Sequence, residues 1–435
     1  MHKHQNNHLS RRDFIRRTGQ HAALTGGLLA ANAMRVTPVL AQAAPETAPE
    51  ETAPATGLRV GWANVSITPD QPVQLAGQFH ERVSKEGILY ECTATALALE
   101  SDGGNDEEEQ AIMISCDISG IDGKMTQEIR DCVADRLPGF DPAKLFINAT
   151  HTHTGPVLSL GVYNDPEPGV MKPAEYRSFF CERVTEAAVQ AWKARKPGAL
   201  SHAVGHAAVG FCRIAVFADG TSRMYGKSDQ PGFIGLEGGC DHGLELLFLW
   251  DKQKTLTGIV INIACPSQVV EGQRYLSADF WGPVREDIKQ LYGDQVFMYP
   301  MISAAGDQSP RDLVRRGRNE PDMRTEAGMR EMGRRIINGV KYAYETAQSK
   351  VNDTPIFQHH TSSLDLPVRL VAEIEAEAAR KEIAKLLEAG EEIKPGSRDA
   401  SMLRRTQDVI DRYEKQITEN TFTMDLHVIR LGDIA

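Results

Sequence analysis

Apolar and polar residues alternate along the chain in patterns that predict both strands and helices. Short apolar runs bounded by polar residues predict strands, and apolar residues three or four positions apart predict helices. Within 122–136, for example, Met125, Ile129, Val133 and Leu137 fall on one helical face. The predicted strands cover residues 58–67, 92–100, 111–117, 144–150, 244–250, 257–264, 295–301 and 421–431. The predicted helices cover residues 122–136, 173–194, 280–292 and 321–347, and two charged helices lie within 370–418.

This order of elements predicts an α/β fold. We expect a mixed β-sheet core flanked by helices, with the core strands placed before residue 305. The two charged helices near the C-terminus are separated by Pro395 and Gly396. They are therefore expected to form a helical hairpin appended to the surface. No internal repeat follows the N-terminal region, so residues 58–435 are interpreted as one domain.

The N-terminal region carries the pattern of an export signal. Residues 10–16 read Ser-Arg-Arg-Asp-Phe-Ile-Arg, which is the twin-arginine pattern. A weakly apolar stretch follows at 21–33, and Ala41-Gln42-Ala43 is a small-residue cleavage site. We expect a signal peptide over 1–43, a flexible linker over 44–57, and periplasmic or secreted protein delivered by the twin-arginine export machinery. The alternative is a basic amphipathic N-terminus of a cytoplasmic protein.

Charge and cysteine content exclude several classes of protein. The chain has a formal net charge of −11, and the basic leader makes the remainder more acidic still, which argues against a nucleic-acid partner. After the leader, no apolar run is long enough to predict a transmembrane segment. The seven cysteines are odd in number and contain no CxxC pair. They predict buried free thiols, not a disulfide framework.

A histidine pair is the strongest local signal for chemistry. Residues 148–156 read Asn-Ala-Thr-His-Thr-His-Thr-Gly-Pro. On a strand, positions i and i+2 face the same side, so His151 and His153 can converge on one point at the strand tip. Neutral imidazole is a common zinc ligand. The alternative is a pair of surface histidines in a polar turn.

A second signal is a candidate nucleophile in the segment 304–310, Ala-Ala-Gly-Asp-Gln-Ser-Pro. Pro310 restricts Ser309 to extended backbone, and Gly306 lets the backbone approach a ligand closely. A serine so placed can act as a nucleophile if a base or a metal activates it. The alternative is an ordinary turn in which Asp307 and Ser309 cap a helix.

Three further positions are candidates with simpler alternatives. Arg213 follows a predicted strand and could stabilise an oxyanion, although a surface charge is the plainer interpretation. His80 lies in the segment 76–82, Ala-Gly-Gln-Phe-His-Glu-Arg, where a solvated loop histidine is the alternative. In the sequence Cys240-Asp241-His242, at most two of the three side chains could face one ion, because neighbours in extended chain point in opposite directions.

These motifs, in this order, resemble the neutral ceramidase family over most of 58–435. The segment THTHTGP at 150–156 is similar to the family's THTHSGP, and GDQSP at 306–310 is similar to its GD-x-SP, whose serine is the nucleophile. Arg213 falls where the family keeps an active-site arginine, and the segment around His80 loosely resembles an early Gly/His/Arg segment. The resemblance implies a zinc amidohydrolase with an α/β catalytic domain.

The same resemblance implies roles for the site residues. His151 would ligate Zn²⁺ with His153 beside it, and Ser309, activated by the metal next to Asp307, would attack the amide carbonyl. Arg213 would hold the oxyanion or a substrate hydroxyl, and His80 would line the substrate pocket. The substrate would be a small, lipid-like N-acyl amide of the sphingolipid type.

Two departures from the family pattern bear on the metal. Cys265, in Cys-Pro-Ser-Gln at 265–268, stands where the family has its second histidine ligand, so either Cys265 or His242 would complete the pair. The family's remaining ligands, a Glu and a Tyr, lie beyond the strand that resembles 421–431. We therefore expect a chain truncated at its C-terminus that binds zinc poorly and has little or no amidase activity.

Two other functions remain open on the sequence. One is a secreted enzyme acting on glycans or glycoconjugates, with a divalent ion held by His151, His153 and Asp279. The other is a non-catalytic binding protein that kept the pocket and lost the chemistry. Fold alone distinguishes neither from an amidase.

Overall fold

The computed structural model describes residues 57–101, 109–388, 393 and 397–435. The predicted signal peptide and all but the last residue of the predicted linker lie outside this part of the chain. The α/β prediction is confirmed, because the core is an eight-stranded mixed sheet in the order β12-β11-β10-β5-β1-β2-β3-β4. Its strands are β1 (Leu58–Ser66), β2 (Thr93–Ser101), β3 (Gln110–Cys116), β4 (Leu145–Ala149), β5 (Lys196–His206), β10 (Gly243–Asp251), β11 (Leu256–Ile263) and β12 (Phe297–Ile302).

The sheet doubles back on itself between β5 and β1. These two strands pair over only two residue pairs, Arg59 with Pro197 and Val60 with Lys196. The fold brings β12 against β4, so that Tyr299 Oη donates a hydrogen bond to Asn148 Oδ1 at 2.6 Å. A shared apolar layer fills the space between the two halves of the sheet, with Trp62, Leu97, Leu249, Val260 and Tyr299 among its members.

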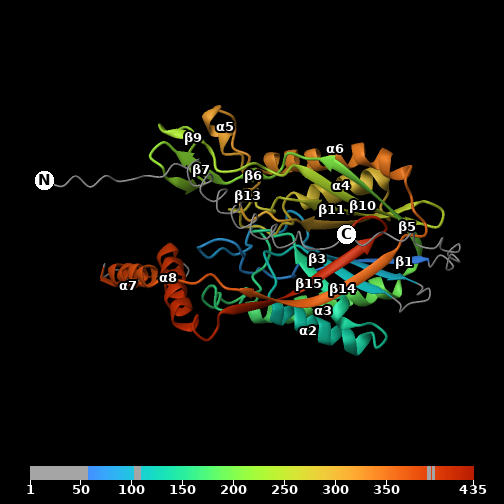
Figure 1. Ribbon diagram of the computed structural model, residues 1–435, viewed down its shortest axis with the longest axis horizontal. Coiled ribbons are helices and arrows are strands. Elements are labelled where there is room, and N and C mark those ends of the chain that lie inside the picture. The colour runs from blue at the N-terminus through green and yellow to red at the C-terminus, as the bar shows by residue number, and fades with distance from the viewer. Residues whose placement is uncertain (1–56, 102–108, 389–392, 394–396) are drawn as a thin grey trace, which may run out of the picture. The chain divides into compact units, whose positions relative to one another are not determined.

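Helices cover the outer faces of both halves, as Figure 1 shows. On one half lie α2 (Gly123–Arg136) and α3 (Pro173–Lys193), and on the other lie α4 (Trp281–Tyr292) and α6 (Glu326–Gln348). The predicted face of α2 is confirmed, since Met125, Ile129 and Val133 are buried, and Asp122 caps the helix by accepting from Met125 N at 2.7 Å. The four layers bury most of the apolar surface away from water.

The predicted start of the long helix at residue 321 is wrong by five positions. The helix α6 begins at Glu326, because the Thr325 hydroxyl accepts a hydrogen bond from Gly328 N at 3.1 Å and caps it there. The preceding residues instead form a turn in which Arg324 pairs with Asp322.

The smaller elements lie at the ends and edges of the sheet. Two of them, β13 (Gln308–Ser309) and β6 (Phe211–Cys212), form a short antiparallel pair. Three strands, β8 (Ser222–Met224), β7 (Ile214–Phe217) and β9 (Phe233–Leu236), form a separate sheet. The single turns η1 (Pro142–Lys144) and α5 (Val314–Gly317) complete this set.

The helical hairpin near the C-terminus is confirmed. Two helices, α7 (Glu373–Glu388) and α8 (Arg398–Lys415), connect β14 (Phe357–Pro367) to β15 (Thr421–Leu431) along the chain. The two strands pair with each other over their whole length. The hairpin contacts the core, because Ser401 Oγ donates to Phe79 O at 2.7 Å and Arg404 Nη1 donates to Val162 O at 3.0 Å. None of the helices in the described ranges is long and apolar enough to span a bilayer.

Candidate functional site

The histidine pair follows strand β4, as the sequence predicts, but it lies in a loop, so the strand alternation that was expected to bring the two rings to one side does not apply. The hydroxyl groups of Thr152 and Thr154 are buried and both donate to Ser277 O, at 2.9 and 3.0 Å. They fix the loop against the segment that leads into α4. The rings of His151 and His153 lie with their centroids 5.0 Å apart and cross at 65°.

His151 is held in one tautomer by the backbone. Its φ of 58° places it in the left-handed region, which is uncommon for a non-glycine residue. Its Nδ1 contacts Ser119 O, and because a carbonyl only accepts, Nδ1 carries the proton and Nε2 keeps its lone pair. Desolvation of the ring by surrounding protein atoms, together with the charges of His153 and Arg213, lowers the pKa of His151. The imidazole is therefore neutral at pH 7 and able to accept a proton.

His153 is held between two polar side chains from the other half of the sheet. Gln268 Nε2 lies 2.8 Å from His153 Nε2, and Glu271 Oε2 lies 3.3 Å from His153 Nδ1. Burial alone would raise the pKa of Glu271, but the interaction with His153 outweighs it and the pKa is lowered. Gly77 packs directly on the ring, and a Cβ on Gly77 would lie 2.1 Å from His153 Cγ.

A buried arginine ties together the three segments around His153. Arg82 is 1% exposed. Its guanidinium donates to Ala76 O and His153 O, both at 2.6 Å, and to Gln273 O at 2.7 Å. Because one guanidinium binds three backbone carbonyls, the backbone of this region has little freedom to move.

Arg213 connects the histidine pair to the candidate nucleophile loop. Its backbone N donates to Asp307 O at 2.9 Å, and its Nη2 donates to Gly306 O at 2.6 Å. Its charge is also felt by His151, as noted above. Arg213 is thus placed by hydrogen bonds to the loop of residues 306–310, beside the candidate nucleophile, where a cation can stabilise a developing oxyanion.

Ser309 lies in β13 and is 3% exposed. Pairing with Phe211 fixes its backbone in extended conformation, in agreement with the restriction that Pro310 imposes. The Oγ accepts a hydrogen bond from Arg311 N at 3.3 Å, and it donates none to any residue that the structure describes. Asp307 is exposed, and its Oδ1 accepts from Gln308 Nε2 at 2.9 Å.

The two candidates for a second metal ligand are both engaged with backbone. Cys265 is fully buried, its Sγ lies 3.2 Å from Val209 O, and burial raises the pKa of its thiol well above the usual value. His242 Nε2 lies 3.1 Å from Gly210 O. Among the described residues, no three His, Cys, Asp or Glu side chains gather so that they could hold a metal ion. The donors present therefore do not fit a three-ligand zinc site.

Two other candidates form no hydrogen bond with the imidazoles in the described part of the chain. His80 is exposed, and the carbonyl of the preceding residue, Phe79, accepts a hydrogen bond from Ser401 of α8. Asp279 is fully buried, and its two oxygens accept from Val270 N at 2.9 Å and Phe280 N at 2.7 Å. Burial raises the pKa of Asp279 to about 7. Its carboxylate is thus used to hold the start of α4.

Sequence reasoning missed three residues that shape the site. Gln268 ends the segment in which Cys265 was singled out, and Arg82 ends the segment in which His80 was singled out. Glu271 follows in the next turn. Weak signals could have suggested two of them. Arg82 lies between two apolar segments, and Gln268 belongs to a polar pair that follows the end of a strand.

No protein-family model and no curated protein matches the chain. Among the solved structures that are similar to it are two ceramidases. One is a ceramidase complexed with C2, with 16% identity, 72% of this chain and 48% of that chain covered, and a TM-score of 0.56. The other is neutral ceramidase from Pseudomonas aeruginosa, with 15% identity, 87% and 61% covered, and a TM-score of 0.59. The chain thus spans less than two thirds of the length of either structure, and it has the fold of the neutral ceramidases.

Proposed function

We propose that the chain is a hydrolase that cleaves the amide of a lipid-like N-acyl substrate through Ser309. One observation carries the proposal: Arg213 is hydrogen-bonded to the loop of Ser309 and acts electrostatically on His151. A nucleophile, an oxyanion-stabilising cation and a neutral imidazole are the groups that acyl transfer needs. The ceramidase fold of the two similar structures supports this class of reaction.

The chemistry divides into two steps. Ser309 Oγ forms a bond to the carbonyl carbon as its proton passes to His151 Nε2, and Arg213 holds the negative oxygen. The carbon–nitrogen bond then breaks, and the amine leaves with the proton from His151, so that an acyl ester remains on Ser309. Water attacks the ester, His151 takes the water's proton and returns it to Ser309, and the carboxylic acid leaves.

Zinc remains a prediction from the family resemblance. Because the described donors do not fit a three-ligand site, no step of the proposed reaction passes through a metal. The proposal therefore departs from the expectation of little or no amidase activity, which assumed a zinc-dependent reaction. Export by the twin-arginine machinery and a periplasmic or secreted location are likewise part of the proposal, supported by the order of the N-terminal signals.

The test is whether the purified chain hydrolyses N-lauroyl amides, with the release of lauric acid as the measured quantity. Ser309→Ala should lower kcat by about a thousandfold or more. Ser178→Ala, at an exposed position on α3, is the matched control and should retain full activity. Full turnover by Ser309→Ala would overturn the proposed nucleophile, and binding without turnover by the wild-type chain would favour a non-catalytic binding protein.

A further inference from the structure

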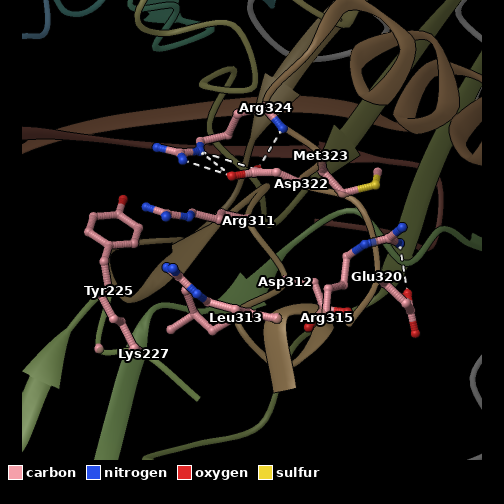
Figure 2. Close-up of a pocket in the computed structure, with 12 residues that line it drawn as sticks. Tyr225, Lys227, Arg311, Asp312, Leu313, Arg315, Glu320, Asp322, Met323 and Arg324 are labelled. Atoms are coloured by element: carbon pink, nitrogen blue, oxygen red, sulfur yellow. Dashed lines mark hydrogen bonds and ion pairs between the residues drawn. The ribbon is translucent and has the colours of Figure 1, made fainter. Parts of the chain in front are cut away.

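A polar cavity of about 330 Å³ lies immediately beyond the Ser309 loop. Its wall is built by the residues that follow β8 and by the segment 311–324. Its lining includes Tyr225, Lys227, Arg311, Arg315, Asp322 and Arg324. Figure 2 shows the guanidinium groups of Arg311 and Arg324 extending to the same side, with the ring of Tyr225 beside Arg311. We call this cavity the arginine pocket.

The arginine pocket has the opposite charge to the chain as a whole. Its lining contains five cationic and three acidic side chains, whereas the chain carries a net charge of −11. A concentration of like charge costs free energy unless counter-charges are placed against it. The excess of cations therefore requires an explanation in terms of what occupies the pocket.

Three of the five cations have partners within the protein. Arg324 pairs with Asp322 at 2.7 Å, Arg315 pairs with Glu320 at 3.4 Å, and Arg316 pairs with Asp229 at 2.9 Å.

The other two cations, Arg311 and Lys227, are the ones left for a ligand. In the part of the chain that the structure describes, neither side chain makes an ion pair or a hydrogen bond. Lys227 is exposed, but Arg311 is half-buried and its guanidinium carbon lies 5.4 Å from the centre of the Tyr225 ring.

The electrostatic environment of Arg311 is unfavourable as it stands. Burial, reinforced by the nearby charge of Arg324, lowers the pKa of Arg311, and the negative charges of Asp322 and Glu271 offset this only in part. A half-buried cation without a partner is costly, and an anion bound against it would offset that cost. A planar guanidinium is suited to carboxylate, sulfonate and phosphate, which it can hold through two parallel hydrogen bonds.

The pocket adjoins the candidate site on two sides. Arg311 N donates to Ser309 Oγ, so the guanidinium begins two residues from the proposed nucleophile. On the other side, the charge of Glu271 acts on both Arg311 and Arg324, and Glu271 contacts His153. An anionic group in the pocket would thus lie next to an amide held at Ser309.

We propose that the arginine pocket binds an anionic group on the substrate, with Arg311 as its principal partner. An apolar acyl tail does not belong among five cations, so the anion belongs to the amine half of the amide. The substrate class is then an N-acyl amide whose amine carries a carboxylate, sulfonate or phosphate. This assignment of substrate rests on the proposed function, whereas anion binding itself does not.

The first experiment compares three substrates that share one acyl chain. N-lauroylglycine and N-lauroyltaurine carry an anion, and N-lauroylethanolamine is neutral. We expect the anionic amides to have a kcat/KM about tenfold or more above the neutral one, and Arg311→Gln to bring that ratio down toward one. Arg311→Lys should restore part of it. Arg334→Gln, at an exposed position on α6 where the arginine pairs with Glu331, should leave the ratio unchanged.

The second experiment measures binding alone, by calorimetric titration with inorganic sulfate and with N-lauroylglycine. Both should bind the wild-type chain saturably, and Arg311→Gln, once circular dichroism shows it folded, should bind both more weakly. Equal turnover of neutral and anionic amides, with a ratio insensitive to Arg311→Gln, overturns the pocket assignment and leaves the amidase proposal intact. Saturable, Arg311-dependent sulfate binding without turnover of any amide overturns the amidase proposal and supports the anion site. Binding that Arg311→Gln does not weaken rejects the anion site.

Discussion

Glu271 Oε2 lies 3.3 Å from Nδ1 of His153, although the two residues come from opposite halves of the folded sheet. Glu271 thus lies against Nδ1 of the ring, while Gln268 Nε2 lies 2.8 Å from the other nitrogen, Nε2. Such a pair of partners fixes both the tautomer and the plane of an imidazole. His153 is accordingly a positioned group and not a freely rotating surface histidine.

Replacing Glu271 by Gln should lower kcat by about 10- to 100-fold, because the imidazole loses the charged partner that orients it. The measurement is kcat and KM with N-lauroylglycine, and kcat should fall while KM and the urea midpoint stay close to the wild-type values. A purely structural role for Glu271 would instead lower the urea midpoint together with the rate. Glu345→Gln, exposed on α6, provides the matched control.

Replacing Gly77 by Ala should destabilise the fold and displace His153. The new Cβ would lie 2.1 Å from His153 Cγ, and the φ of 90° is itself unfavourable for alanine. We expect a loss of about 2 to 4 kcal/mol in the free energy of unfolding, measured by urea denaturation. Gly272→Ala meets open space and should cost far less. Equal stability of the two variants would show that the ring is not packed as described.

The stability of the chain should fall in acid through the contact of His427 with His359. Their Nδ1 and Nε2 atoms are 3.1 Å apart. Burial, followed by the charges of His359 and Arg130, lowers the pKa of His427 to about 4, so the folded state binds fewer protons than the unfolded state between about pH 6.5 and that value. Stability present above pH 6.5 is therefore lost as the pH falls through this window.

Urea titrations from pH 4 to 7 measure this effect. After allowance for solvent screening of the half-exposed ring, we expect the wild-type chain to lose about 1 to 2 kcal/mol over the window. His427→Asn should flatten the dependence. An unchanged slope in the variant would assign the acid sensitivity to other groups.

Zinc binding by the purified chain should be weak. His151 offers one free lone pair, His153 is engaged by Gln268 and Glu271, and Cys265 and His242 face backbone carbonyls. We expect less than one zinc per chain after dialysis, measured by elemental analysis, and turnover that survives a chelator. One tightly held zinc whose removal abolishes turnover would contradict this prediction and support the metal role that the family resemblance implies.

The elements of the core could be predicted because their apolar patterns are local. The central strand β5 was missed because Pro197 and Gly198, which follow a helix in the sequence, are ordinary signals of a helix end. They also begin this strand, which pairs with β10 along its length. Tertiary pairing, which the local sequence does not encode, decided between the two interpretations.

The candidate site was predictable only where a single short segment carries it. His151 with His153, and Asp307 with Ser309, stand within a few residues of each other, and both segments follow strands as expected. Glu271 reaches His153 only because the sheet folds back, and nothing in its own turn marks it. The positions of Cys265 and His242 likewise depend on the backbone carbonyls of residues 209 and 210. The sequence pattern does not predict these contacts.

The two-pair junction between β1 and β5 has a consequence for assembly of the molecule. Each half of the sheet has its own helices and its own apolar layer, so each can gain order before the other. His151, His153, Gly77 and Arg82 belong to the first half, and Arg213, Glu271 and Ser309 belong to the second. Catalytic competence should therefore be the last property acquired during refolding, after most secondary structure has returned.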